Sequence, residues 1–123
     1  ALMPRAGRPD YSAAKAAMVA MTASLAKAVA SEGITVNTVS PGTILSGRLE
    51  AAFRKAAEDQ GVAADAPWED VERAALPQFA AVPVGRVGTV EEITDAIAFL
   101  VSPRAGYITG TNLRVDGGMW PGV

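Results

Sequence analysis

One long helix-forming stretch limits what this chain can fold into more than any other feature. Between Ala16 and Ala30 most residues are alanine, methionine, leucine or valine, a composition typical of a stable helix that Gly33 is well placed to end. Small and apolar residues lie on nearly every side, and a helix that is apolar all round is normally buried. We therefore expect it to pack on a sheet on one side and on a partner, such as another subunit, on the other.

The start of this helix has a tyrosine and a lysine four residues apart, in Tyr11-Ser12-Ala13-Ala14-Lys15. At that spacing the Tyr11 and Lys15 side chains share one helix face. An unperturbed tyrosine ionises near pH ~10, and a fixed positive charge beside it favours the phenolate, which suits general acid/base catalysis. The same spacing occurs by chance on many helices, so the motif alone also fits an ordinary surface pair.

Composition excludes several kinds of site. The 123 residues include no cysteine and no histidine, which excludes thiol chemistry, histidine-based zinc sites and Ser-His-Asp triads. We expect no metal, and any acid or base must be Tyr, Lys, Asp or Glu. The net charge of -2 argues against nucleic acid as the main partner.

The sequence predicts no membrane partner either. The longest charge-free apolar run lies between Lys15 and Lys27, well short of the ~20 residues that a membrane span needs. No positively charged start precedes an apolar segment, as it would in an export signal. We therefore expect a soluble protein of the cytoplasm.

The middle of the chain predicts a strand followed by a helical insertion. Residues 34–40 are rich in β-branched side chains and end at Pro41-Gly42, which places the carboxyl end of a strand there. A helix that feeds such a strand indicates a layered α/β fold, in which ligands bind at this edge. Within residues 45–82, two amphipathic helices, the second stopping before Pro77, are typical of a lid.

Several apolar residues of this insertion have two possible roles. They could line an apolar substrate pocket, or they could simply pack the two helices together, which is the simpler interpretation. The candidates for the pocket are Leu45, Leu49, Phe53, Trp68 and Phe79.

The last third of the chain predicts one more helix and one more strand. Thr89 to Glu92 fit a capping box, and the following helix has an ordinary apolar stripe as far as Ser102-Pro103. Residues 108–118 predict a turn, a short strand and a turn. We interpret the acidic residues of the helix as a solvated face without chemistry: Glu91, Glu92 and Asp95.

Four ordered motifs together resemble the short-chain dehydrogenase/reductase family, in the branch that includes 3-oxoacyl-carrier-protein reductases. The motifs cover essentially the whole chain: residues 11–15, Val36–Ile44, Pro83–Arg86 with Glu91-Glu92-Ile93, and Ile108–Gly110 with Val115–Gly118. The resemblance implies an enzyme that moves a hydride between NAD or NADP and a small carbonyl or alcohol substrate. The implied fold is α/β, the C-terminal half of a Rossmann-type doubly wound parallel sheet with a helical substrate lid.

The resemblance also implies roles for single residues. Tyr11 would exchange a proton with the substrate oxygen, and Lys15 would hydrogen-bond the nicotinamide ribose and assist the tyrosine. The nicotinamide would lie against a proline and a glycine, an isoleucine backbone would hold its carboxamide, and a serine would replace the usual threonine hydroxyl: Pro41, Gly42, Ile44 and Ser46. Asn37 lies inside the strand, so we interpret it as a structural hydrogen-bonding residue and not as the family's catalytic asparagine.

The motifs that the family has before its tyrosine are not found before Tyr11. The glycine-rich phosphate loop, the residue that selects NAD or NADP, and the catalytic serine and asparagine should come before it, but only ten residues do. Two strands also make too small a parallel sheet, because such sheets are normally buried on both faces. We therefore expect residues 1–123 to be the C-terminal part of one longer domain, with a lid at about 45–82.

Two hypotheses about function stay open. In the first, the chain is part of a full-length oxidoreductase, which resembles family members that form homodimers or homotetramers through the Ala13–Ala30 helix and the last strand. In the second, the chain is a truncated, inactive product that only pairs its helices with another chain.

Overall fold

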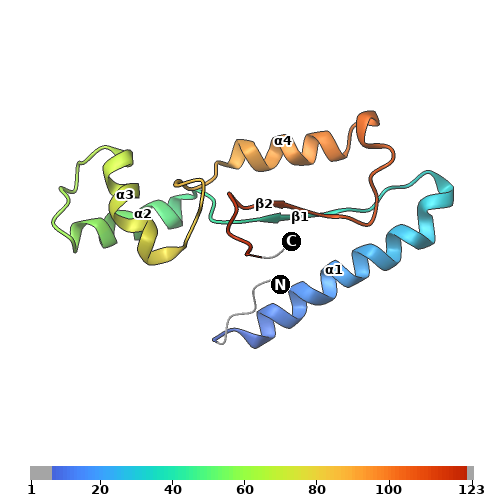
Figure 1. Ribbon diagram of the computed structural model, residues 1–123, viewed down its shortest axis with the longest axis horizontal. Coiled ribbons are helices and arrows are strands. Elements are labelled where there is room, and N and C mark those ends of the chain that lie inside the picture. Colours follow the sequence, from blue (N-terminus) through green and yellow to red (C-terminus); the bar gives the residue numbers. More distant parts are fainter. Residues whose placement is uncertain (1–6, 122–123) are drawn as a thin grey trace. The chain divides into compact units, whose positions relative to one another are not determined.

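The computed structural model describes residues 7–121, which belong to two compact units (Figure 1). The first unit contains Ala1–Ser40 and Thr94–Arg114, and the second contains Pro41–Ile93 and Val115–Val123. Two strands, β1 (Thr38–Pro41) and β2 (Asn112–Val115), each continue from the first unit into the second.

A single long helix begins the first unit. Helix α1 spans Pro9–Val29, continues as the 3-10 turn η1 (Ala30–Glu32), and ends at Gly33 with a φ of 75°. A proline in the first turn and a left-handed glycine after the last are the signals that the sequence offers. Only Ala26 of its 21 residues is buried, so α1 has the expected apolar composition but leaves most of its surface uncovered.

Helix α1 together with η1 is also long enough to cross a membrane. Pro9–Glu32 spans 24 residues, its most apolar window has a mean hydropathy of 1.3, and 6% of that window is buried. The charge-free part of this helix, between Lys15 and Lys27, is still shorter than the ~20 residues of a membrane span, as expected. Length and composition alone do not distinguish a membrane helix from the core helix of a larger protein.

Strands β1 and β2 form a parallel pair. The N–H of Thr38 donates to the carbonyl of Thr111, and the N–H of Gly42 donates to the carbonyl of Val115, both at 2.9 Å. Both residue numbers rise by four between these bonds, so the strands run in the same direction. The predicted parallel α/β arrangement is confirmed for the described part of the chain.

β1 begins later than predicted, because side chains replace the sheet ladder before Thr38. The N–H of Val36 donates to the Thr109 hydroxyl at 3.0 Å. The Asn37 amide donates to the Ile108 carbonyl at 2.9 Å and accepts from the Thr111 N–H at 3.2 Å. Residues 34–37 are therefore irregular, and the structural interpretation of Asn37 is confirmed.

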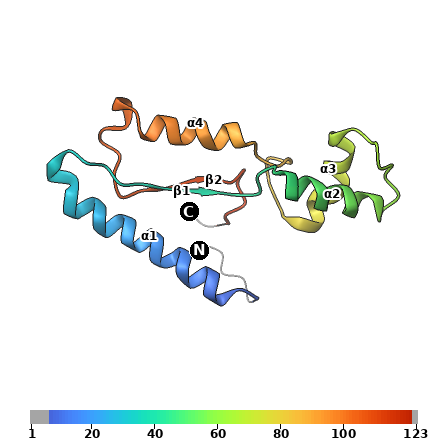
Figure 2. The ribbon, with the colours of Figure 1, turned by 180° about the vertical axis from the view of Figure 1, so that it is seen from behind.

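Two helices of the second unit pack side by side (Figures 1 and 2). Helix α2 spans Gly47–Glu58 and helix α3 spans Trp68–Phe79. Contrary to expectation, α3 continues past Pro77. Proline there removes only one hydrogen bond, two residues before the helix ends. The buried core beside these helices consists of Phe53, Ala57, Val71, Ala75, Leu76 and Val87.

Helix α4 spans Val90–Leu100 and begins with the predicted capping box. The N–H of Thr89 donates to the Glu92 carboxylate at 2.8 Å, and the N–H of Glu92 donates to the Thr89 hydroxyl at 3.2 Å. These bonds satisfy donors that the first turn leaves free. The chain then makes a 3-10 turn, η2 (Pro103–Ala105), so the predicted stop near Ser102-Pro103 is confirmed.

Candidate functional site

The tyrosine and the lysine at the start of α1 lie on one face of the helix, as their spacing predicts. The Nζ atom of Lys15 lies 5.6 Å from the centre of the Tyr11 ring, and Nζ also contacts the Met18 sulfur at 3.7 Å. Tyr11 is 51% exposed. The two side chains therefore lie close together on an accessible face at the start of α1, and their catalytic role stays a prediction.

A second cation lies beside this pair, and the sequence reasoning missed it. The Cζ atom of Arg8 lies 5.4 Å from the centre of the Tyr11 ring, and its Nε lies 3.5 Å from the Asp10 carboxylate. Arg8 is three residues before Tyr11, a spacing that brings side chains together at the start of a helix. Tyr11 therefore has two cations as neighbours within the first unit.

The other predicted cofactor residues belong to the second unit, where β1 ends at Pro41 as expected. A Cβ atom on Gly42 would lie 2.7 Å from the Cα of Asp116. Real Cβ atoms do not approach backbone so closely, so only glycine lets these two strand ends meet. This packing reason for Gly42 is independent of any ligand.

The bridge that holds Ile44 does not use its own backbone groups. A parallel bridge joins Ile44 to Gly88: the Gly88 N–H donates to the Thr43 carbonyl at 2.9 Å, and the Leu45 N–H donates to the Gly88 carbonyl at 2.8 Å. Because peptide groups alternate along a strand, the N–H and C=O of Ile44 point away from Gly88. This donor and acceptor pair matches the acceptor and donor of a carboxamide.

Ser46, predicted to offer a hydroxyl to the cofactor, caps α2. Its side chain accepts the N–H of Leu49 at 3.3 Å. Serine is a preferred residue at this position because it satisfies a free donor of the first turn. The hydroxyl thus has a structural role in the described residues, and its contact with a cofactor stays a prediction.

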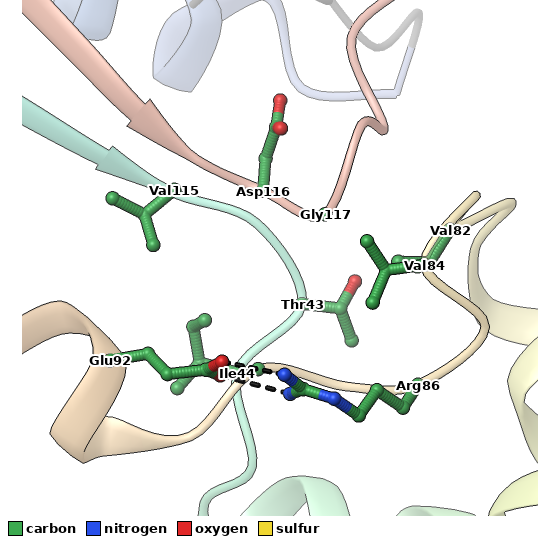
Figure 3. A pocket seen from close by; sticks show the side chains of 10 residues that line it. Thr43, Ile44, Val82, Val84, Arg86, Glu92, Val115, Asp116 and Gly117 are labelled. Carbon is green, nitrogen blue, oxygen red and sulfur yellow. Dashed lines mark hydrogen bonds and ion pairs between the residues drawn. The ribbon is translucent and has the colours of Figure 1, made fainter.

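A small pocket of about 100 Å³ lies in the second unit (Figure 3). Of the predicted site residues, only Ile44 lines it. The pocket also contains an ion pair, in which Arg86 donates to both carboxylate oxygens of Glu92 at 3.0 and 2.6 Å. Its lining residues are Thr43, Ile44, Val82, Val84, Arg86, Gly88, Glu92, Val115, Asp116 and Gly117.

The Arg86–Glu92 pair adds a specific partner to Glu92, whose side chain is 40% exposed as part of the expected solvated face. The hydrogen bonds from Arg86 and from the Thr89 N–H lower the pKa of Glu92 to about 2. The same pairing raises the pKa of Arg86. The predicted capping box places the Glu92 carboxylate at the first turn of the helix. An arginine six residues earlier, Arg86, was therefore the sequence signal that could have predicted this ion pair.

The five candidates for the substrate pocket lie in or against the α2–α3 core instead of the small pocket. Phe53 is fully buried, and its ring centre lies 5.8 Å from that of Trp68 and 4.5 Å from that of Phe79. Leu45 and Leu49 are partly buried against the same core. Core packing alone explains the position of the Phe53 side chain. The Phe79 side chain also packs on Phe53 but is 41% exposed. A role for these side chains in substrate binding stays a prediction.

Comparison with known proteins extends over nearly the whole chain. The family model described as enoyl-(acyl carrier protein) reductase matches residues 2–120. The chain is 45% identical to the 3-oxoacyl-acyl-carrier-protein reductase FabG of Vibrio cholerae over 118 residues, which are 96% of this chain and 41% of that protein. The chain therefore spans about two fifths of the length of the curated relatives that it matches.

Solved structures give the same result for the fold. An L-sorbose reductase from Gluconobacter frateurii, complexed with NADPH and L-sorbose, aligns with a TM-score of 0.75 at 31% identity, covering 94% of this chain and 41% of that one. A short chain oxidoreductase from Pseudomonas aeruginosa PAO1 aligns with a TM-score of 0.75 at 33% identity, covering 91% and 40%.

Proposed function

The chain belongs to the short-chain dehydrogenase/reductase family, and on that premise we propose that it serves an NAD(P)-dependent oxidoreductase that interconverts a carbonyl and an alcohol. The observation that supports this function best is the Tyr11–Lys15 pair, with the ammonium 5.6 Å from the ring centre. Tyr11 protonates the carbonyl oxygen or deprotonates the alcohol. Lys15 would hydrogen-bond the nicotinamide ribose and assist Tyr11.

The second unit offers groups that fit a nicotinamide. The N–H and C=O of Ile44 complement its carboxamide, and the Pro41-Gly42 segment lies at the carboxyl end of β1, the edge where α/β sheets bind ligands. Ser46 adds a hydroxyl to this set. When bound, the cofactor would give or take the hydride, while Tyr11 moves the proton. Either NAD or NADP is compatible with these residues.

The remaining parts of the proposal concern substrate and assembly. The substrate is a small carbonyl or alcohol compound, bound beside apolar residues of the α2–α3 lid: Leu45, Leu49, Phe53, Trp68 and Phe79. The protein acts in the cytoplasm as a homodimer or homotetramer. Subunits contact through α1, whose Met18, Met21 and Leu25 side chains are 46%, 62% and 45% exposed, and through β2.

Replacing Tyr11 by phenylalanine in the full-length enzyme tests the catalytic role. General acid/base groups contribute roughly 10²–10⁴-fold to rate, so Tyr11→Phe should lower kcat at least about a hundredfold. Calorimetric titration with NADH and NADPH should give a nearly unchanged Kd, because only a hydroxyl is removed. Lys15→Ala should damage both kcat and Kd. Near-normal turnover of Tyr11→Phe would reject the assignment.

The second candidate function is an inactive chain that acts only by helix pairing. The observation that favours it is the uncovered apolar surface of α1, on which only Ala26 is buried. The intact mass of the protein in its source cells separates the candidates. A mass near 12.6 kDa would favour helix pairing, and a mass near twice that would favour the oxidoreductase.

A further inference from the structure

Three consecutive backbone N–H groups beside the pocket have unusually different acceptors. The N–H of Val87 donates to the Glu72 carboxylate at 2.6 Å, that of Gly88 to the Thr43 carbonyl at 2.9 Å, and that of Thr89 to the Glu92 carboxylate at 2.8 Å. The middle bond, which joins this segment to Thr43, thus lies between two bonds to carboxylates. Hydrogen bonds to ionised acceptors are shorter and stronger than bonds between neutral groups.

The two carboxylates come from different helices and are themselves fixed. Glu72 belongs to α3, and Val87, which it holds, is 4% exposed and packs in the α2–α3 core. Glu92 belongs to α4 and accepts two hydrogen bonds from Arg86 (Figure 3). The charge of Glu72 also contributes to the raised pKa of Arg86, after the larger contribution of Glu92.

Fixing residues 87–89 in turn fixes Ile44. Gly88 bonds to the residues on either side of Ile44, as the bridge requires. The side chains are also close, because a Cβ atom on Gly88 would lie 2.7 Å from the Ile44 Cδ1 atom. A shift of Gly88 would therefore move both the backbone and the side chain of Ile44.

We propose that Glu72 and Glu92 are positioning residues that set the Ile44 backbone for binding the nicotinamide carboxamide. This inference rests on the proposed function, which assigns Ile44 to the cofactor. Neither glutamate touches the cofactor in this scheme: each acts through a neighbour of Gly88, and Gly88 acts through its bridge to Ile44. Loss of either carboxylate should weaken cofactor binding more than it lowers the catalytic rate at saturating cofactor.

The test uses the full-length enzyme with Glu72→Ala and Glu92→Ala, which remove the acceptors of the Val87 and Thr89 N–H groups. Calorimetric titration with NADH and NADPH should show a Kd raised about tenfold, since small displacements of a binding group have effects of this order or larger. The value of kcat at saturating cofactor should fall by less than about threefold. Glu72→Gln keeps an oxygen that can accept the Val87 N–H, so it should restore most of the affinity.

A matched control and a second kind of variant keep the test decisive. Asp70→Asn removes another α3 carboxylate, whose ion pair with Arg73 at 2.9 Å is exposed, and should leave Kd unchanged. If Glu72→Ala does not fold, Glu72→Asp supplies the measurement. Its side chain is one methylene shorter, so the carboxylate is drawn away from the Val87 N–H that Glu72 now accepts at 2.6 Å, and Kd should rise.

Two failures are distinguishable. Folded Glu72→Ala and Glu92→Ala enzymes with a Kd within about twofold of the wild type would overturn the positioning role while leaving the proposed function intact. A wild-type enzyme that binds neither NADH nor NADPH would overturn the proposed function itself.

Discussion

The first and second units bury their apolar residues to different extents. In the second unit, α2 and α3 enclose Phe53 and Val71, which are 0% and 1% exposed. In the first unit, α1 is longer than either helix yet buries only Ala26. Helical stability in proteins comes mostly from packing an apolar face. The second unit therefore has its own core, whereas α1 is mostly uncovered within the described residues.

The largest expected difference in the free energy of unfolding is that between Phe53→Ala and Met21→Ala. Removing a buried phenylalanine leaves a cavity and costs about 3–5 kcal/mol in the free energy of unfolding. Met21 is 62% exposed, and exposed substitutions usually stay within about 0.5 kcal/mol. Urea unfolding of the purified protein measures both. The small cost holds for the monomer. In the proposed oligomer, where subunits contact through α1, Met21→Ala should cost more than about 1 kcal/mol, and an equally large cost in the monomer would break the comparison.

Gly42→Ala should have the next largest effect. Its Cβ would lie 2.7 Å from the Cα of Asp116, and overpacking against backbone typically costs about 1–3 kcal/mol. Gly47→Ala is the control within the same unit, since nothing lies within 4 Å of a Cβ there. Gly47→Ala should be neutral or slightly stabilising. Equal thermal stability of both variants would contradict the close approach at Gly42.

Acid should weaken the ion pair between Arg86 and Glu92 in the second unit. The pKa of Glu92 falls from 4.5 to about 2 in the folded protein, so the pair stabilises the fold above the unfolded pKa. That contribution is lost as the pH falls through about 2. Unfolding measured from neutral pH to pH ~2 should show this loss, and Glu92→Gln should remove it. An unchanged pH dependence in Glu92→Gln would contradict the assignment.

The smallest effect is expected at the surface of α2. Lys55 and Asp59 form an ion pair at 3.7 Å with side chains that are 77% and 69% exposed. Exposed pairs on helices are worth at most about 0.5 kcal/mol, so Lys55→Ala should barely change the midpoint of urea unfolding. A larger loss would mean that surface charge, and not the Phe53 core, maintains the second unit.

Local signals predicted the described elements well. The proline and glycine that bound α1, the amphipathic spacing of α2, and the capping box at Thr89 each depend on residues close in sequence, and the structure confirms them. The order of four motifs predicted the family correctly. Local order was sufficient here because helix ends and caps are decided within one or two turns.

Long-range contacts account for what the sequence did not predict. The start of β1 depends on Asn37 bonds to Ile108 and Thr111, about seventy residues away. The environment of Glu92 depends on Arg86 and on the fold of the loop between them. Pro77 remained helical because it lies near the end of α3, a boundary that propensity alone misplaced by a few residues.

The stacking of Trp68 against Phe53 has a practical consequence for optical experiments. Both tryptophans, Trp68 and Trp120, belong to the second unit, and both tyrosines, Tyr11 and Tyr107, belong to the first. Trp68 lies against the fully buried Phe53 ring, so its emission should shift to longer wavelength when the α2–α3 core opens. The two tyrosines are already exposed in the folded first unit, Tyr11 to 51% and Tyr107 to 103%, so their absorbance should change little on unfolding. Tryptophan emission thus reports on the second unit selectively, without any added label.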